Sequence, residues 1–262
     1  MLGAIIGDLA GSIYEYDQIK NFKPVKINNI IEHNSFISDD TILTIAIADA
    51  IINNASYEDK LKEYVLKFEN VKPTYSPYFK TMFSPGFISW AKSNIQGKSC
   101  GNGAMMRVSP IGYLFNSEQE VITNSYLATI PSHNTPEAIE CAKTIALIIF
   151  YARKGLTKQE IINKLNLKIK KPNIEKFNYT CTDTIDLCLY SLFHSNNFEQ
   201  SLKLAISFGG DTDTNASIVG SMAEAMYGID NNLKQLALSK LPSSFISILT
   251  KSYELTYKNL EY

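Results

Sequence analysis

The sequence predicts an all-α fold. Apolar residues recur with a period of about 3.6 residues instead of alternating as in half-buried strands, and the apolar windows are too long for strands. Helix-start signals precede several of these windows. In the run Thr135-Pro136-Glu137, a capping hydroxyl is followed by a proline at the first helical position and by a carboxylate in the first turn. These observations together predict helices throughout the chain.

The predicted helices follow one another along the whole chain. The first carries a glycine at every fourth position, and two others begin at acidic clusters, near residues 39 and 213. The helix near residue 135 begins at the proline signal, and the remaining helices follow from apolar periodicity. Their approximate ranges are 2–16, 39–54, 57–69, 85–95, 118–129, 135–154, 157–165, 182–194, 198–208, 213–227, 231–240 and 243–258.

Irregular stretches separate some of these helices. None has the length or the Ser/Gly content of an interdomain linker, and we find neither a repeat of fixed period nor a low-complexity block. We therefore expect a single domain over residues 1–262. The irregular stretches are 17–37, 70–84, 97–112 and 166–179.

The composition indicates a folded protein with no general attraction to polyanions. Of the 262 residues, 45% are hydrophobic and 19% are charged, close to a globular average and far from the polar signature of disorder. Lys and Arg number 25 against 26 Asp and Glu, so the net charge is −1. No overall positive field would attract phosphate backbones or anionic lipid. We expect a nucleic acid only as a modified substrate.

The four cysteines and the apolar stretches predict a cytoplasmic location. The cysteines form no CxxC pair and are too few for a disulfide framework, so we interpret them as reduced thiols. The apolar N-terminus lacks a basic segment and is interrupted by Asp8. The longest purely apolar stretch, 145–152, is too short to cross a bilayer, and we expect no membrane partner.

Oxygen-bearing side chains are crowded into the run Gly209-Gly210-Asp211-Thr212-Asp213-Thr214-Asn215, between two helical patterns. Oxygen ligands without His or Cys select hard cations, so Mg²⁺ or Mn²⁺ suits this cluster. Asp and Thr would also cap the following helix without any metal, and this run alone leaves both interpretations open. A calcium EF-hand does not fit, because Ala216 replaces its turn glycine and Met222 replaces its bidentate glutamate.

A second acidic cluster, Ser38-Asp39-Asp40-Thr41, precedes the apolar run 42–52. Helix capping explains one acidic residue, but two adjacent like charges repel each other unless a cation or a donor group lies between them. If the two helix starts converge in space, four carboxylates surround one small volume. A two-metal site would neutralise them.

The N-terminal segment has glycine at positions 3, 7 and 11, which makes one helix face flat. Glycine inside a helix costs about 1 kcal/mol relative to alanine, so three of them indicate that a neighbouring backbone packs closely. Beside this face, Asp8, Ser12 and Glu15 form a polar stripe at i, i+4 and i+7. The stripe either faces solvent or brings a carboxylate to a buried site.

A loop of small residues runs from Lys98 to Arg107. Such loops let backbone N–H groups approach phosphates, but this one is not a Walker A sequence because no Gly-Lys-Ser/Thr follows. Arg107 is one of two arginines in a chain with 23 lysines, so either its planar fork is needed or it stands there by chance. His133 precedes a helix start, and no Ser-His-Asp or Cys-His mechanism follows from the spacing.

In this order, the segments resemble the ADP-ribosylglycohydrolase family from residue 3 to about residue 228. One such motif would be weak evidence, whereas several in the family's order are specific. The matching motifs are Gly-Asp-x-x-Gly-Ser-x-Tyr-Glu at 7–15, Ser-Asp-Asp-Thr at 38–41, Pro-Gly at 85–86, Gly-Asn-Gly-Ala-Met-Met-Arg at 101–107, Ser-His-Asn at 132–134 and Gly-Gly-Asp-Thr-Asp-Thr-Asn at 209–215.

The resemblance implies a compact single-domain orthogonal helix bundle of the ADP-ribosylglycohydrolase type, holding two Mg²⁺ or Mn²⁺ ions. By motif matching, one ion would be held by Ser38, Asp39 and Asp40 and the other by Asp211 and Thr214, with Asp213 as a bridge. The family usually has threonine at the position of Ser38. Serine keeps the hydroxyl, so we expect the ligand to be retained.

The resemblance also implies catalytic and substrate-binding residues. Glu15 and Asp40 match catalytic positions, and Glu15 is the candidate for proton transfer. The residues that match segments contacting ADP-ribose are Gly86, Ser99, Cys100, Gly101, Asn102 and His133.

The implied activity is metal-dependent hydrolysis of the bond between the anomeric carbon of ADP-ribose and an acceptor, with the ions orienting the ribose and a water. The expected partners are an ADP-ribosylated protein or a small ADP-ribose conjugate, with ADP-ribose as the product and the protein as a monomer. Two alternatives stay open: a non-catalytic ADP-ribose-binding or structural protein on the same scaffold, and an unrelated Mg²⁺-dependent phosphohydrolase. The acceptor, whether arginine, serine, a nucleobase or an acetyl ester, is not predicted.

Overall fold

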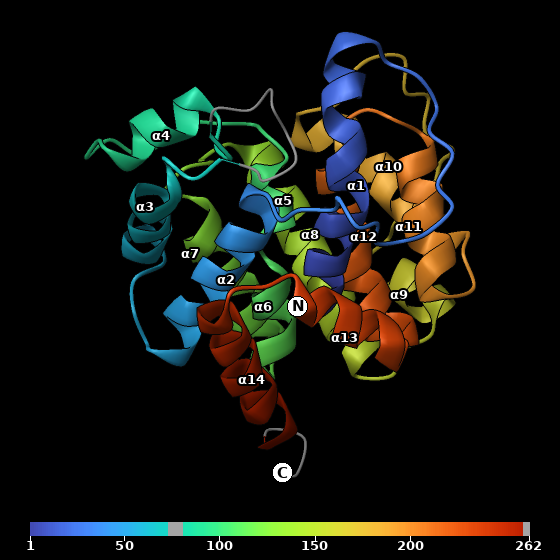
Figure 1. The fold of residues 1–262 in the computed structure, drawn as a ribbon. Coiled ribbons are helices and arrows are strands. Elements are labelled where there is room, and N and C mark those ends of the chain that lie inside the picture. The colour runs from blue at the N-terminus through green and yellow to red at the C-terminus, as the bar shows by residue number, and fades with distance from the viewer. Residues whose placement is uncertain (73–80, 259–262) are drawn as a thin grey trace.

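Helices form wherever the sequence predicts them (Figure 1). The structure is a computed structural model that describes residues 1–72 and 81–258. Within these residues there is no strand, only two isolated β-bridges that pair Lys98 with His133 and Gly101 with Thr180. The prediction of an all-α fold is therefore confirmed.

The helix bounds agree with the predicted ranges to within a few residues. In chain order the helices are α1 (Leu2–Lys20), α2 (Asp39–Ile52), α3 (Tyr57–Phe68), α4 (Pro85–Ala91), α5 (Gly103–Met106), α6 (Ser109–Leu114), α7 (Glu118–Thr129), α8 (Pro136–Arg153), α9 (Lys158–Lys164), α10 (Cys181–Phe193), α11 (Phe198–Ser207), α12 (Thr212–Tyr227), α13 (Asn231–Ser239) and α14 (Ser243–Lys258).

The structure differs from the prediction in the stretches expected to be irregular. Two short helices, α5 and α6, lie in the stretch 97–112, and each is too short to show an apolar period. Helix α1 continues about one turn past residue 16, because the polar residue Gln18 is buried there and accepts a hydrogen bond from the N–H of Lys23 at 3.1 Å. Within the predicted stretch 70–84, residues 73–80 lie outside the described residues.

Side-chain caps start many of these helices. The hydroxyls of Ser38, Ser56 and Thr135 each accept a hydrogen bond from an N–H in the first turn of the helix that follows. Ser117 and Thr157 form complete capping boxes, each with a glutamate three residues later. The start signal predicted at Thr135 is therefore confirmed.

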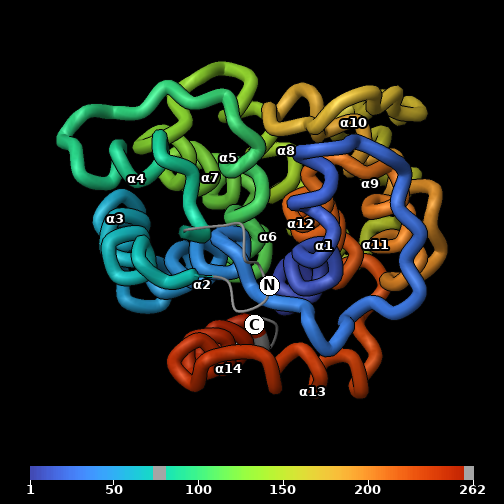
Figure 2. Tube along the Cα trace, turned by 45° about the horizontal axis from the view of Figure 1, so that its top comes forward, coloured from blue at the N-terminus to red at the C-terminus, as the bar shows by residue number. Residues whose placement is uncertain are grey.

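Helices α1 and α12 pack backbone to backbone in antiparallel orientation, side by side at the centre of the molecule (Figures 1 and 2). A Cβ atom on Gly3, Gly7 or Gly11 would lie 2.0–2.2 Å from a backbone oxygen of α12. The opposing oxygens belong to Gly220, Ala216 and Thr212. The flat glycine face predicted for this helix is thus filled by a neighbouring backbone, and the C-terminal turns of α1 lie beside the start of α12.

The buried apolar side chains form one contiguous cluster that extends from α1 to α14. Helices α2, α8 and α12 supply much of it, with Ile45, Ile148 and Ile218 among the fully buried side chains. None of the helices in residues 1–72 and 81–258 is long and apolar enough to cross a membrane.

Candidate active site

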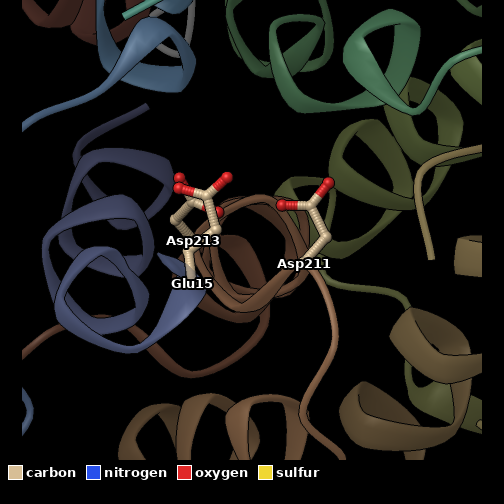
Figure 3. Close-up of side chains that lie close together, drawn as sticks. All are labelled: Glu15, Asp211 and Asp213. Carbon is tan, nitrogen blue, oxygen red and sulfur yellow. The ribbon is translucent and has the colours of Figure 1, made fainter. Parts of the chain in front are cut away.

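Acidic side chains from three helices converge at the point where α1 ends and α2 and α12 begin. One carboxylate oxygen from each of Glu15, Asp211 and Asp213 lies within 4.8 Å of the others, and Figure 3 shows these three side chains turned toward one volume. Helix α2 joins the cluster directly, because the Thr214 hydroxyl donates to the Asp40 carboxylate at 3.1 Å. The two acidic clusters therefore converge in space, a point that the sequence alone left open.

Asp8 fixes the position of α2 against α1. Its Oδ2 accepts hydrogen bonds from the N–H of Ser38 at 2.9 Å and from the N–H of Thr41 at 3.1 Å. The Thr41 hydroxyl donates to the same oxygen at 2.5 Å. Asp8 and Ser12 are buried and the half-buried Glu15 lines the cavity described below, so the polar stripe of α1 leads to the site and does not face the outer surface.

Helix capping does not account for the acidic residues at the start of α2. Ser38 supplies the cap, since its hydroxyl accepts from the N–H of Asp40 at 3.2 Å. The same hydroxyl lies 3.4 Å from Asp40 Oδ2. The Oδ1 atoms of Asp8 and Asp40 are buried and have no hydrogen-bond partner among the described residues. A buried carboxylate oxygen in this condition is one that a cation would satisfy.

Helix capping does not account for the acidic residues at the start of α12 either. Asp211 occupies the N-cap position, yet its side chain makes no capping hydrogen bond. It accepts instead from the side-chain amide of Asn102 at 2.7 Å. Asp213 Oδ1 accepts the N–H of its neighbour Thr214 at 2.9 Å. Helix capping therefore does not explain the position of the Asp211 side chain.

Burial and mutual repulsion make the cluster electrostatically unfavourable when it is fully ionised. Burial first, and the Asp213 charge second, raise the pKa values of Glu15, Asp39 and Asp40 well above the ordinary carboxyl range. The same two causes raise the pKa of Asp8 to about 7. Carboxylates and hydroxyls without a nitrogen or sulfur ligand are the donor set that hard divalent cations prefer. The residues present therefore fit Mg²⁺ or Mn²⁺.

A cavity of about 680 Å³ opens beside the cluster, a size typical of small-ligand sites. The cluster residues in its wall are Glu15, Asp39, Asp211, Asp213 and Thr214. The predicted substrate-binding residues in its wall are Gly86, Ser99, Gly101, Asn102 and His133. Ser38, Asp40 and Cys100 do not line it.

The loop 98–103 is held in place by its own polar groups. The N–H of Gly101 donates to the Ser99 hydroxyl at 3.0 Å, and the N–H of Asn102 donates to the carbonyl of Tyr179 at 2.9 Å. Two backbone donors that could approach a phosphate are thus already engaged. The Cys100 carbonyl accepts the N–H of Cys181 at 2.8 Å, which ties the loop to α10.

Some residues that line the cavity or support its acidic loop were not predicted from the sequence. Phe87 stacks on Trp90 with ring centroids 5.0 Å apart, and both rings line the cavity. Asn178 accepts the N–H of Asp211 at 3.0 Å and so supports the acidic loop. A lone aromatic residue in an apolar window reads as a core residue, and Asn178 lies in a Lys/Asn-rich stretch without a motif. No sequence signal marks them.

The fold and the cavity define an all-helical protein with a carboxylate cluster beside a ligand-sized cavity, an arrangement typical of a hydrolase. A model of the ADP-ribosylglycohydrolase family matches residues 1–254, and the chain belongs to this family of glycosidic-bond hydrolases.

Named relatives and a solved structure agree with this assignment. The ADP-ribosylarginine hydrolase Tri1 of Pseudomonas putida is 24% identical over 265 residues, which cover 87% of this chain and 70% of that protein. The ADP-ribosylhydrolase ARH3 of Danio rerio is 21% identical, over 88% of this chain and 82% of its own. A structure described as an ADP-ribosylglycohydrolase-related protein complex superposes with a TM-score of 0.70 at 18% identity and covers 97% of both chains. This last similarity confirms the fold.

Proposed function

We propose that this protein is a metal-dependent hydrolase that cleaves the bond between the anomeric carbon of ADP-ribose and an acceptor. The reaction would reverse mono-ADP-ribosylation of protein side chains or release ADP-ribose from a related small conjugate. One observation carries the proposal. Carboxylates from α1, α2 and the start of α12 converge beside a ligand-sized cavity, and the buried Oδ1 atoms of Asp8 and Asp40 in this cluster lack partners among the described residues.

The proposed metal site uses the oxygen ligands of both acidic clusters. The side chains that would hold two Mg²⁺ or Mn²⁺ ions are Ser38, Asp39, Asp40, Asp211, Asp213 and Thr214. When bound, such ions orient the ribose hydroxyls and lower the pKa of a water molecule. The side-chain amide of Asn102 donates to the Asp211 carboxylate at 2.7 Å and so limits its rotation.

Glu15 is our candidate for proton transfer. It lines the cavity and its carboxylate lies within 4.8 Å of those of Asp211 and Asp213. Burial and the neighbouring Asp213 charge raise the pKa of Glu15, as a group that exchanges a proton near neutral pH requires. Asp40, the other catalytic candidate, lies behind the cavity wall and accepts the Thr214 hydroxyl. We therefore assign Asp40 to metal binding and the proton to Glu15.

The rest of the cavity would hold the ADP-ribose. The aromatic pair Phe87 and Trp90 offers flat apolar surface, and His133 and Ser99 offer polar groups on the same wall. If ADP-ribose fills this cavity, its bond to the acceptor would lie beside the carboxylate cluster. The proposed substrates are accordingly ADP-ribosylated proteins or small ADP-ribose conjugates, with ADP-ribose as product.

The experiment is a product analysis. Arginine-linked and serine-linked mono-ADP-ribosyl peptides are incubated with the protein in Mg²⁺, Mn²⁺ or EDTA, and the products are identified by mass. We expect intact ADP-ribose that forms with metal, disappears in EDTA and disappears with Asp213→Asn. The control Asp17→Asn removes an exposed carboxylate from α1 and should keep full activity. AMP or phosphate as product would overturn the proposal in favour of a phosphohydrolase, and binding of ADP-ribose without turnover of either peptide or of an O-acetyl-ADP-ribose ester would favour a binding protein.

A further inference from the structure

Arg107 is a fully buried cation that forms no ion pair with the acidic side chains of residues 1–72 and 81–258. Its side chain is 0% exposed and lines the cavity. It takes part in none of the ion pairs formed by the described residues. Its Nε and Nη1 atoms have no hydrogen-bond partner there, and the guanidinium lies 5.7 Å from the centre of the Phe87 ring. Burying an unpaired charge carries a large desolvation cost, so we expect Arg107 to have a role beyond packing.

The one engaged nitrogen of Arg107 begins a chain of hydrogen bonds. Nη2 donates to the Ser132 hydroxyl at 2.7 Å and to the Ala128 carbonyl at 3.2 Å. The Ser132 oxygen in turn lies 2.7 Å from Nδ1 of His133. Arg107 Nη2 itself lies 3.5 Å from the same ring nitrogen.

The directions of these bonds follow from the chemistry of the groups. A guanidinium only donates, so the Ser132 oxygen accepts from Arg107. The described residues offer the Ser132 hydroxyl proton no acceptor other than Nδ1 of His133. A proton on Nδ1 would also face the N–H of a cation. Nδ1 is therefore the accepting nitrogen.

The remaining ring nitrogen of His133 then carries the proton. Burial, and then the charge of Arg107, lower the pKa of His133 well below its ordinary value, so the ring is neutral at pH 7. Nε2 points to the loop that lines the cavity. A Cβ built on Gly101 or Gly103 would lie 3.6 or 3.4 Å from it.

We propose that Arg107 is a positioning residue that acts through Ser132 to hold His133 as the neutral Nε2–H tautomer. His133 then presents one fixed N–H donor to the cavity wall formed by Gly101 and Gly103. This N–H would donate a hydrogen bond to an oxygen atom of a bound nucleotide. The ligand part rests on the proposed function, whereas the tautomer is a property of the free protein.

The test is ¹⁵N NMR of histidine-labelled protein. The chain has 3 histidines, so the His133 signals are assigned by their loss in His133→Gln. In the wild type at pH 7 we expect an unprotonated Nδ1 and a protonated Nε2. In Arg107→Met, the Ser132 oxygen is free to accept from Nδ1–H, and both tautomers should be populated. Arg107→Lys restores a cationic donor and should restore the single tautomer.

A second readout is the dissociation constant of ADP-ribose, which we expect to rise about tenfold in Arg107→Met. A wild-type spectrum with the proton on Nδ1 would overturn the proposal even if Arg107→Met does not fold. An unchanged Nε2–H tautomer in a folded Arg107→Met protein would overturn the role of Arg107. If the wild type shows the expected tautomer but does not bind ADP-ribose, the proposed function fails and the tautomer assignment stands.

Discussion

Glu15 is the acidic side chain whose loss should separate catalysis from folding. Glutamine keeps the shape of the side chain and removes the exchangeable proton, so Glu15→Gln should lower kcat by about 100-fold or more, the usual worth of a general acid or base. Steady-state kinetics at saturating Mg²⁺ measures this. Asp17→Asn changes an exposed carboxylate on the same helix and should leave kcat unchanged. Nearly full turnover of Glu15→Gln with intact metal binding would rule out the proton-transfer role.

Asp213 should control metal affinity. It is buried between Asp211 and Glu15, and its charge is the largest charge contribution to the raised pKa values of Glu15, Asp39 and Asp40. Removing this charge takes away a ligand shared by both proposed ions. We expect Asp213→Asn to raise the half-saturating Mg²⁺ concentration at least tenfold, measured by calorimetry. An unchanged Mg²⁺ affinity would place the cations elsewhere.

At this scale the sequence predicts the site residues that lie in motifs and misses those that lie outside them. Asp39, Asp40, Asp211 and Asp213 lie in dense acidic runs that capping alone explains poorly, and the structure brings them together. Asn178 supports Asp211 across 33 positions of sequence, and nothing local to either residue announces that contact.

The contact between α1 and α12 should be intolerant of a single methyl group. A Cβ on Gly7 would lie 2.0 Å from the carbonyl oxygen of Ala216, which is backbone and cannot move aside. We expect Gly7→Ala to lower the free energy of unfolding by about 1–3 kcal/mol or more, as overpacking does. It should also weaken Mg²⁺ binding, because α1 carries Glu15 and Asp8 to the site.

The control for this substitution is Gly86→Ala. A Cβ on Gly86 meets nothing within 4 Å, and the residue lies in α4, where alanine is the better helix former. Urea unfolding should show a neutral or stabilising effect of up to about 1 kcal/mol. A Gly7→Ala protein as stable as Gly86→Ala would contradict the backbone contact.

Helices were predictable from the sequence where they are long or well capped. Periodicity and caps locate α2, α3 and α8 to within one or two residues. Helices α5 and α6 span 4 and 6 residues, fewer than two turns, and so carry no readable period. The sequence predicts the end of α1 about one turn too early, because the buried polar residue Gln18 interrupts the apolar pattern. Its side-chain Oε1 accepts the N–H of Lys23.

For the whole molecule, the acidic cluster predicts how stability depends on pH. Asp8 has its folded-state pKa raised to about 7, and Glu15, Asp39 and Asp40 are raised as well. A carboxyl whose folded pKa is raised stabilises the fold below its unfolded pKa, near 4, and loses that contribution as pH rises through the folded pKa. In EDTA, this contribution should fall by a few kcal/mol between pH 4 and pH 8.

Divalent cations should reverse this trend, because only the ionised carboxylates bind them. We expect the stabilisation by Mg²⁺, taken as the difference in unfolding free energy with and without the ion, to be larger at pH 8 than at pH 5. Urea titrations at the two pH values measure it. A Mg²⁺ effect that is equal at both values, or larger at pH 5, would contradict the site.

The glycines of α1 and the buried Asp8 also determine how the three helices of the site are arranged. Glycines set the distance between α1 and α12, Asp8 docks α2, and the three helix ends then meet. The glycine face, Asp8 and the two acidic clusters can each be recognised in the sequence. Only the folded structure shows that they lie around one volume. The sequence does not predict the acceptor of the proposed reaction, because surface loops around a site carry such specificity and local motifs do not encode their shape.

Titration of metal-free protein with Mn²⁺, followed by electron paramagnetic resonance, tests the central claim that these carboxylates form a two-cation site. Ions about 3.5–4 Å apart in a shared site are magnetically coupled. The account predicts two Mn²⁺ per chain with a spin-coupled spectrum, and loss of the coupling in Asp213→Asn but not in Asp17→Asn. Binding of one Mn²⁺ or none, or two uncoupled ions that persist in Asp213→Asn, would contradict it.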